Sequence, residues 1–162
     1  MVKNRKDGQV SSYVCPTELI AFSDRIDEFK KIHAEVVTIS TNSKFSLLTA
    51  TQVPRNERGF GMMKIPLISD ENHKISRDYG ILDEEKGVSY RGFFVIDEKG
   101  IIRQITINDK QVGRSVDEAL RLVQAYQFSD KNEQYCPVDW HPGDECMKPT
   151  LQDSLKYYQK HY

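Results

Sequence analysis

The sequence predicts an α/β fold in a single domain, because helical and strand patterns alternate along its 162 residues. Amphipathic helix patterns follow Cys15 and Ser115, and two strand patterns near residue 100 are joined by a turn-forming segment. Together these observations indicate strands that are covered by helices.

The first helix is expected over residues 16–31. Leu19, Phe22, Ile26 and Phe29 fall on one face at helical spacing, and Pro16 suits a first helical position, where no backbone N–H is needed. Strands rich in β-branched residues are expected at 34–40 and 64–69. Shorter helices are expected at 45–51 and 75–79.

The second half of the chain begins with a predicted β-hairpin, whose strands cover 90–96 and 101–107. Ser115 and Glu118 form a capping-box signature at the start of a second long helix. Residues 129–149 are expected to form an extended tail, and a closing helix is expected at 151–158. The predicted organisation is a divergent polar start at 1–11, a main domain at 12–128 and a C-terminal tail at 129–162.

The charge balance excludes several classes of partner. Lys and Arg number 23 against 24 Asp and Glu, so the formal charge of -1 gives no reason to expect nucleic acid or anionic lipid. The basic start of the chain is followed by no apolar run, and no stretch is long and apolar enough to span a bilayer. We therefore predict a cytoplasmic protein with no membrane contact.

Three cysteines are too few for a secreted disulfide scaffold, and this leaves redox, metal-binding or core roles. Cys15 stands at the start of the first predicted helix, where unpaired N–H groups and the helix dipole favour an anion. A free thiol titrates near pH ~8.5, so this position predicts a lowered pKa and a reactive thiolate. The alternative from position alone is a buried, inert cysteine.

Four segments resemble the diagnostic blocks of typical two-cysteine peroxiredoxins: YVCPTELIAFSDR, RGFFVIDEKG, IIRQITIND and VGRSVDEALRLVQAYQ. They occur in the family's order and spacing, from about residue 13 onward. The resemblance implies a thioredoxin-like fold of the peroxiredoxin subtype, with a central mixed sheet flanked by helices. It also implies reduction of hydrogen peroxide and organic hydroperoxides with thioredoxin, or a similar dithiol protein, as the reductant, and no cofactor or metal.

The resemblance also implies roles for individual residues. Cys15 matches the nucleophile that becomes a sulfenic acid, and Arg91 matches the arginine that holds the thiolate and orients the peroxide. Glu18 and Arg114 match a carboxylate and a second arginine that support the first arginine. Ser12 stands where the family has a hydroxyl that hydrogen-bonds thiolate and peroxide.

In the tail, Cys136 matches the family's resolving cysteine, which forms a disulfide with the nucleophile of the partner subunit. The resemblance therefore implies a homodimer or a decamer of such dimers, and a local unwinding around Cys15 before the disulfide forms. Cys146 has no counterpart in the family and is interpreted as a free tail thiol. A zinc site at Cys136, His141 and Cys146 is a weaker alternative, because the usual close cysteine pairing is absent.

The start of the chain departs from the family. Members carry a longer segment before the nucleophile, including an apolar strand that ends in a Pro-x-x-x-Thr-x-x-Cys motif, whereas residues 2–10 here are mostly polar and Gly8 replaces the proline. A central parallel strand is buried on both faces, so these residues predict an N-terminally shortened fold whose sheet lacks its middle. The alternative function is a catalytically impaired chaperone or assembly protein, or a truncated fragment.

Overall fold

A computed structural model describes residues 14–162 of the chain. The chain divides into two compact units, one ending at Val116 and the other running from Asp117 to Tyr162. The polar start at 1–11 lies outside the described residues, and the predicted boundary between 128 and 129 stays a prediction. None of the helices in the described range combines the length and apolar character that a bilayer crossing requires.

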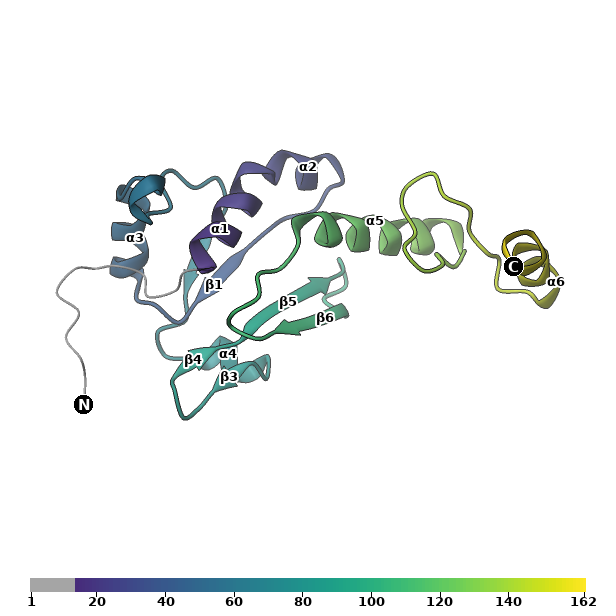
Figure 1. The fold of residues 1–162 in the computed structure, drawn as a ribbon. Helices are drawn as coiled ribbons and strands as arrows, with labels where there is room; N and C mark the ends of the chain where they lie inside the picture. Colours follow the sequence, from purple (N-terminus) through teal and green to yellow (C-terminus); the bar gives the residue numbers. More distant parts are fainter. Residues whose placement is uncertain (1–13) are drawn as a thin grey trace. The chain divides into compact units, whose positions relative to one another are not determined.

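The first unit opens with two helices in place of the one predicted over 16–31. Figure 1 shows α1 (Cys15–Asp24) leading directly into α2 (Ile26–Lys31). Arg25 leaves helical geometry, with φ -97° and ψ 13°, and its guanidinium binds Glu28 of the next turn at 2.6 Å. The apolar face continues across this break, because Leu19, Phe22, Ile26 and Phe29 are all buried.

The other predicted elements of this unit are present with shifted bounds. The predicted helices are α3 (Lys44–Gln52) and α4 (Lys74–Asp78), and the 3₁₀ turn η1 (Arg55–Glu57) lies between them without having been predicted. The strands are β1 (Thr38–Ser40), β2 (Leu67–Ser69), β3 (Leu82–Asp83), β4 (Val88–Ser89), β5 (Arg91–Ile96) and β6 (Ile102–Asn108). The small β3–β4 hairpin is the pair that the sequence pattern did not predict, because two residues are too few to show alternation.

Strand pairing differs from the expected single central sheet. Residues 14–162 form three sheets of two strands each. Strands β1 and β2 are parallel, whereas β3–β4 and β5–β6 are antiparallel hairpins. Apolar side chains on these strands remain between 39% and 54% exposed: Ile39, Ile68, Ile105 and Ile107. The prediction of a missing middle strand concerns residues 2–10, which lie outside the described residues, so it stays a prediction.

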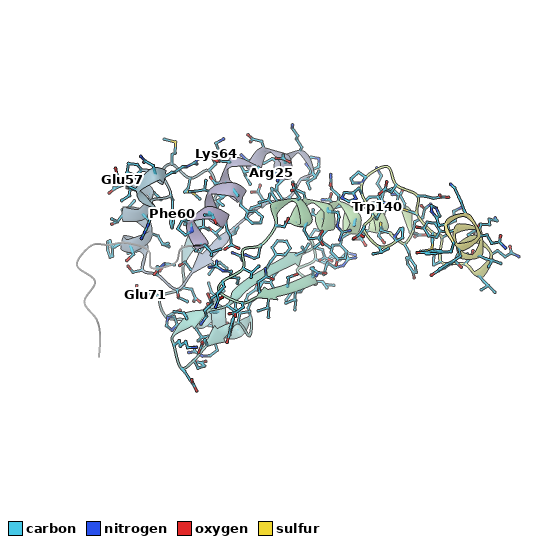
Figure 2. All side chains as sticks on the ribbon, in the orientation of Figure 1. Arg25, Glu57, Phe60, Lys64, Glu71 and Trp140 are labelled. Carbon is cyan, nitrogen blue, oxygen red and sulfur yellow. The ribbon has the colours of Figure 1, made fainter. Side chains whose placement is uncertain are left out.

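The core of the first unit packs directly against the start of α1. Leu19, Leu47, Ala50 and Phe60 form the buried cluster, and Cys15 packs against it. Phe60, which is labelled in Figure 2, is completely buried, and its N–H donates to the Ala50 carbonyl at 2.7 Å. The first residue of α1 is therefore partly buried at the edge of the hydrophobic interior.

The loop that carries Phe60 depends on a glycine and on an ion pair. A Cβ at Gly59 would lie 1.9 Å from the Val53 carbonyl oxygen, so only glycine fits beside the end of α3. Arg55 binds Asp24 at 2.8 Å and donates from Nε to the Phe60 carbonyl at 3.1 Å. These contacts hold the loop against the end of α1.

The second unit consists of most of α5 (Val116–Asn132), a tail loop and α6 (Leu151–His161) (Figure 1). The predicted closing helix is thus confirmed, with Thr150 as its N-cap accepting from the Asp153 N–H at 3.2 Å. Trp140, which is labelled in Figure 2, lies in the tail loop and is 2% exposed. Its ring lies 4.9 Å from that of Phe128 on α5.

Candidate active site

Cys15 is the first residue of α1, followed by Pro16, as the sequence predicts. The Val14 carbonyl accepts hydrogen bonds from the N–H groups of Thr17 at 3.0 Å and Glu18 at 3.3 Å. The Thr17 hydroxyl donates to the same oxygen at 2.6 Å. The amides after Pro16 that were expected to stabilise the thiolate are therefore occupied by Val14 instead.

The expected lowering of the Cys15 pKa is also corrected. Burial against the apolar cluster is the main effect and raises the pKa of the thiol, and the nearby Glu18 carboxylate raises it further. The charges of Arg91 and Arg114 and a hydrogen bond from Arg91 act in the opposite direction. Arg91 is thus beside the sulfur, and its guanidinium is the described group that most favours the charged form.

A buried carboxylate joins the two arginines. Glu18 is 4% exposed, and its Oε2 lies 2.5 Å from Nη1 of Arg91. Its Oε1 accepts from Nε of Arg114 at 2.8 Å and from the backbone N–H of Arg114 at 2.6 Å. Three segments far apart in sequence, α1, the start of β5 and the loop before α5, therefore meet at one carboxylate.

The charges of this cluster do not cancel until the thiol ionises. Two guanidiniums and one carboxylate leave a net charge of +1 beside Cys15. A thiolate at Cys15 would bring the group to neutrality in a region of low dielectric, where such compensation matters most. The same positive charge can stabilise a negative oxygen that develops next to the sulfur.

Comparisons with known proteins agree with this geometry. Residues 9–105 match the model of the AhpC/TSA family, and residues 125–161 match the C-terminal domain of 1-Cys peroxiredoxin. The chain is 56% identical over 149 residues to Peroxiredoxin-1 of Gallus gallus, covering 92% of this chain and 75% of the relative. The chain belongs to the peroxiredoxin family.

Further relatives support the same assignment. Peroxiredoxin-2 of Bos taurus is 53% identical over 150 residues, covering 93% of this chain and 75% of the relative. The solved structure of the reduced 2-Cys peroxiredoxin of Plasmodium vivax matches with a TM-score of 0.89 at 36% identity, covering 91% of this chain and 76% of that one. The thioredoxin-like fold is therefore confirmed, and the chain is a thiol-dependent peroxidase. The alternative of a catalytically impaired chaperone or assembly protein is not favoured.

The structure of this peroxiredoxin brings four of the six predicted site residues together: Cys15, Glu18, Arg91 and Arg114. Ser12 lies outside the described residues, so its role stays a prediction. Cys136 belongs to the second unit, where its thiol donates to the Ala125 carbonyl at 3.6 Å. No group of three or more potential metal ligands occurs within residues 14–162, which gives the zinc alternative no support.

Sequence reasoning missed the backbone groups that orient the arginines. Nε of Arg91 donates to the Lys110 carbonyl at 2.7 Å, and Nη1 of Arg114 donates to the Gly92 carbonyl. Carbonyl oxygens carry no sequence signal, because every residue has one. The glycine at position 113 is a weak sequence signal that the loop before α5 lies close to the start of α1, since a Cβ there would lie 3.2 Å from the Val14 side chain.

The Glu18 ion pairs predict acid lability of this peroxiredoxin. Burial acts to raise the Glu18 pKa, but the hydrogen bonds and charges of Arg114 and Arg91 outweigh it and leave the pKa lowered. A lowered pKa in the folded state adds stability above the unfolded value of about 4.3 and loses it as the pH falls below that value. Urea denaturation between pH 7 and pH 3 should show that the free energy of unfolding falls more steeply with decreasing pH for wild type than for Glu18→Gln.

Glu18→Gln is also expected to be less stable at pH 7, by about 3–5 kcal/mol, because it leaves the buried Arg91 and the partly buried Arg114 without a counter-charge. Glu28→Gln is the matched control. Glu28 also binds an arginine, at 2.6 Å, but its side chain is 46% exposed. Its removal should leave the pH dependence close to that of wild type, and equal slopes for wild type and Glu18→Gln would contradict the prediction.

Proposed function

We propose that Cys15 is the group that reduces peroxides, and that hydrogen peroxide and organic hydroperoxides are the substrates. The observation that carries this proposal is the hydrogen bond and charge of Arg91 at a thiol that begins a helix. The sulfur attacks one peroxide oxygen, the O–O bond breaks, and the other oxygen leaves as water or an alcohol. The thiol's own proton ends on the leaving oxygen, so the step needs no further reactant.

The cluster around Glu18 explains how a partly buried thiol can perform this step. Negative charge moves from sulfur to the two oxygens, and the net positive charge of the cluster favours both the starting thiolate and the leaving oxygen. The Glu18 carboxylate and the Lys110 carbonyl hold the Arg91 guanidinium from two sides. Arg114 is a positioning residue, because it acts on Arg91 through Glu18.

Resolution is proposed to use Cys136 of the partner subunit in a homodimer, or in a decamer of such dimers. Its thiol attacks the Cys15 sulfenic acid, an S–S bond forms, and the hydroxyl leaves as water. The start of α1 must open for this step, because Cys15 is packed against the core. A thioredoxin-type dithiol then reduces the disulfide. The cytoplasm is the proposed compartment, because three cysteines are too few for the disulfide framework of a secreted protein.

Peroxide consumption with thioredoxin, thioredoxin reductase and NADPH tests this function, with Cys136→Ser as the informative variant. Wild type is expected to turn over repeatedly. Cys136→Ser should consume about one equivalent of peroxide per chain and then stop, because it lacks the thiol that is proposed to attack the Cys15 sulfenic acid. A wild type that consumes no peroxide would refute the peroxidase assignment, and a variant that turns over like wild type would refute the role of Cys136.

A further inference from the structure

Cys136 and Cys146 face each other across the tail loop. Tyr135 and Met147 form an antiparallel bridge in which each N–H donates to the other's carbonyl, at 2.7 Å and 3.0 Å. The next opposed pair along the two segments is Cys136 and Cys146, in the position without backbone hydrogen bonds. Such pairs have Cα atoms about 4.5 Å apart, which lies within the ~4.4–6.8 Å that a disulfide allows.

The side chains of the two cysteines are in contact. The Cys146 thiol hydrogen-bonds that of Cys136, and burial together with the neighbouring Cys146 raises the pKa of Cys136 to about 11. Both cysteines are reduced and partly buried. At neutral pH Cys136 is thus a protonated thiol that reacts slowly with free peroxide, and its nearest sulfur is that of Cys146.

The surrounding loop holds this arrangement in place. Trp140 Nε1 donates to the Asp144 carbonyl at 3.2 Å, and Arg121 of α5 donates to the Trp140 carbonyl at 3.3 Å. The His141 N–H donates to the Asp144 carboxylate at 2.7 Å. These contacts close the loop between the two cysteines before any S–S bond exists, so little conformational entropy remains to be lost when the bond forms.

We propose that Cys146 is a second resolving thiol, which takes over the disulfide from Cys15. This step rests on the proposed function, because that function supplies the Cys15–Cys136 disulfide. The Cys146 thiolate attacks the Cys136 sulfur, the Cys136–Cys146 bond forms, and Cys15 leaves as a thiolate. The number of disulfides is unchanged, so no further oxidant is needed, and the thioredoxin-type dithiol reduces the tail disulfide.

Two features of the structure favour the products of this exchange. The new disulfide joins residues that are already opposite each other within one compact unit, so their effective concentration is high. The released Cys15 thiolate regains the positive charge of Arg91, and its side chain can return to the cluster around Phe60. The exchange therefore restores the reduced Cys15 site, while the disulfide remains in the tail between Cys136 and Cys146.

The test compares wild type with Cys146→Ser after one equivalent of hydrogen peroxide, without thioredoxin. Free thiols are blocked with N-ethylmaleimide, and the products are analysed on a non-reducing gel and by mass spectrometry of tryptic peptides. In wild type, most of the oxidised protein is expected to run as a monomer with a Cys136–Cys146 linkage and a blocked Cys15. In Cys146→Ser, most should run as a covalent dimer linked through Cys15 and Cys136.

The outcomes separate this inference from the proposed function. A wild type that runs as a covalent dimer with Cys146 blocked would overturn the exchange and leave the peroxidase assignment intact. A wild type that consumes no peroxide would overturn the peroxidase assignment, and with it the exchange.

Cys15→Ser provides two controls. With one equivalent of peroxide it should form no Cys136–Cys146 disulfide during the time in which wild type is oxidised, and equal rates would overturn a transfer from Cys15. In an oxidising glutathione buffer, the same folded variant should form that disulfide, seen as the loss of two hydrogens in mass. Its absence there would show that the two thiols cannot pair and would overturn the inference.

Discussion

Cys15→Ser is expected to reduce peroxide consumption with thioredoxin to the uncatalysed background. A serine hydroxyl is almost entirely protonated at neutral pH and cannot form a sulfenic acid, so the O–O bond has no nucleophile. The measurement is NADPH oxidation in the coupled assay, supported by dimedone labelling. Wild type should carry the sulfenic-acid label at Cys15, and the variant should carry none at this position.

Thr17→Ser is the matched control for Cys15→Ser. It changes a residue in the same first turn and keeps a hydroxyl that can donate to the Val14 carbonyl, as Thr17 does at 2.6 Å. Its activity should stay close to that of wild type. A thermal melt of both variants should show cooperative transitions, and equal turnover by Cys15→Ser and wild type would refute the assigned nucleophile.

Arg91→Met is expected to slow the reaction of Cys15 with peroxide by about 10²–10³-fold, the usual effect of removing one donor that stabilises developing charge. Arg91 also lowers the Cys15 pKa, so its removal should move the pH profile of Cys15 alkylation to higher pH. Stopped-flow kinetics with hydrogen peroxide and the rate of iodoacetamide labelling measure the two effects. Arg91→Lys should recover part of the rate, since it keeps the charge but loses the planar fork.

Arg103→Met serves as the control for Arg91→Met. Arg103 belongs to the same hairpin and pairs with Asp97 at 3.5 Å, but it lies at the opposite end of the strands from Arg91. Its loss should leave both the rate and the pH profile unchanged. If Arg91→Met and Arg103→Met gave equal activities, Arg91 would have no part in the chemistry.

Local patterns in the sequence predicted most of the elements. The apolar face from Leu19 to Phe29, the hairpin around residue 100 and the long helix after Ser115 depend on neighbours in the chain, so periodicity and capping residues reveal them. The break at Arg25 escaped this reasoning, because the apolar face continues through it. The resemblance supplied the site residues, and the structure shows how Glu18 joins two of them.

The properties of the thiol groups depended on tertiary packing. The start of a helix predicted a lowered pKa for Cys15, but Val14 occupies the amides, and the core around Phe60 raises the pKa by burial. Cys146 resembled a free tail thiol in the sequence, yet the Tyr135–Met147 bridge places it opposite Cys136. Val14 is adjacent to Cys15 in the chain, but the apolar cluster around Phe60 and the segment that carries Cys146 come from elsewhere, and spacing along the sequence does not predict their contacts.

The sequence by itself determined the family, the order of most elements and the candidates for the reacting residues, because these follow from local patterns and motifs. Tertiary structure alone decided the charge balance at Cys15, the backbone groups that hold Arg91 and the pairing of Cys136 with Cys146. The physical reason is that electrostatic and desolvation energies depend on distances in space, and folding sets those distances.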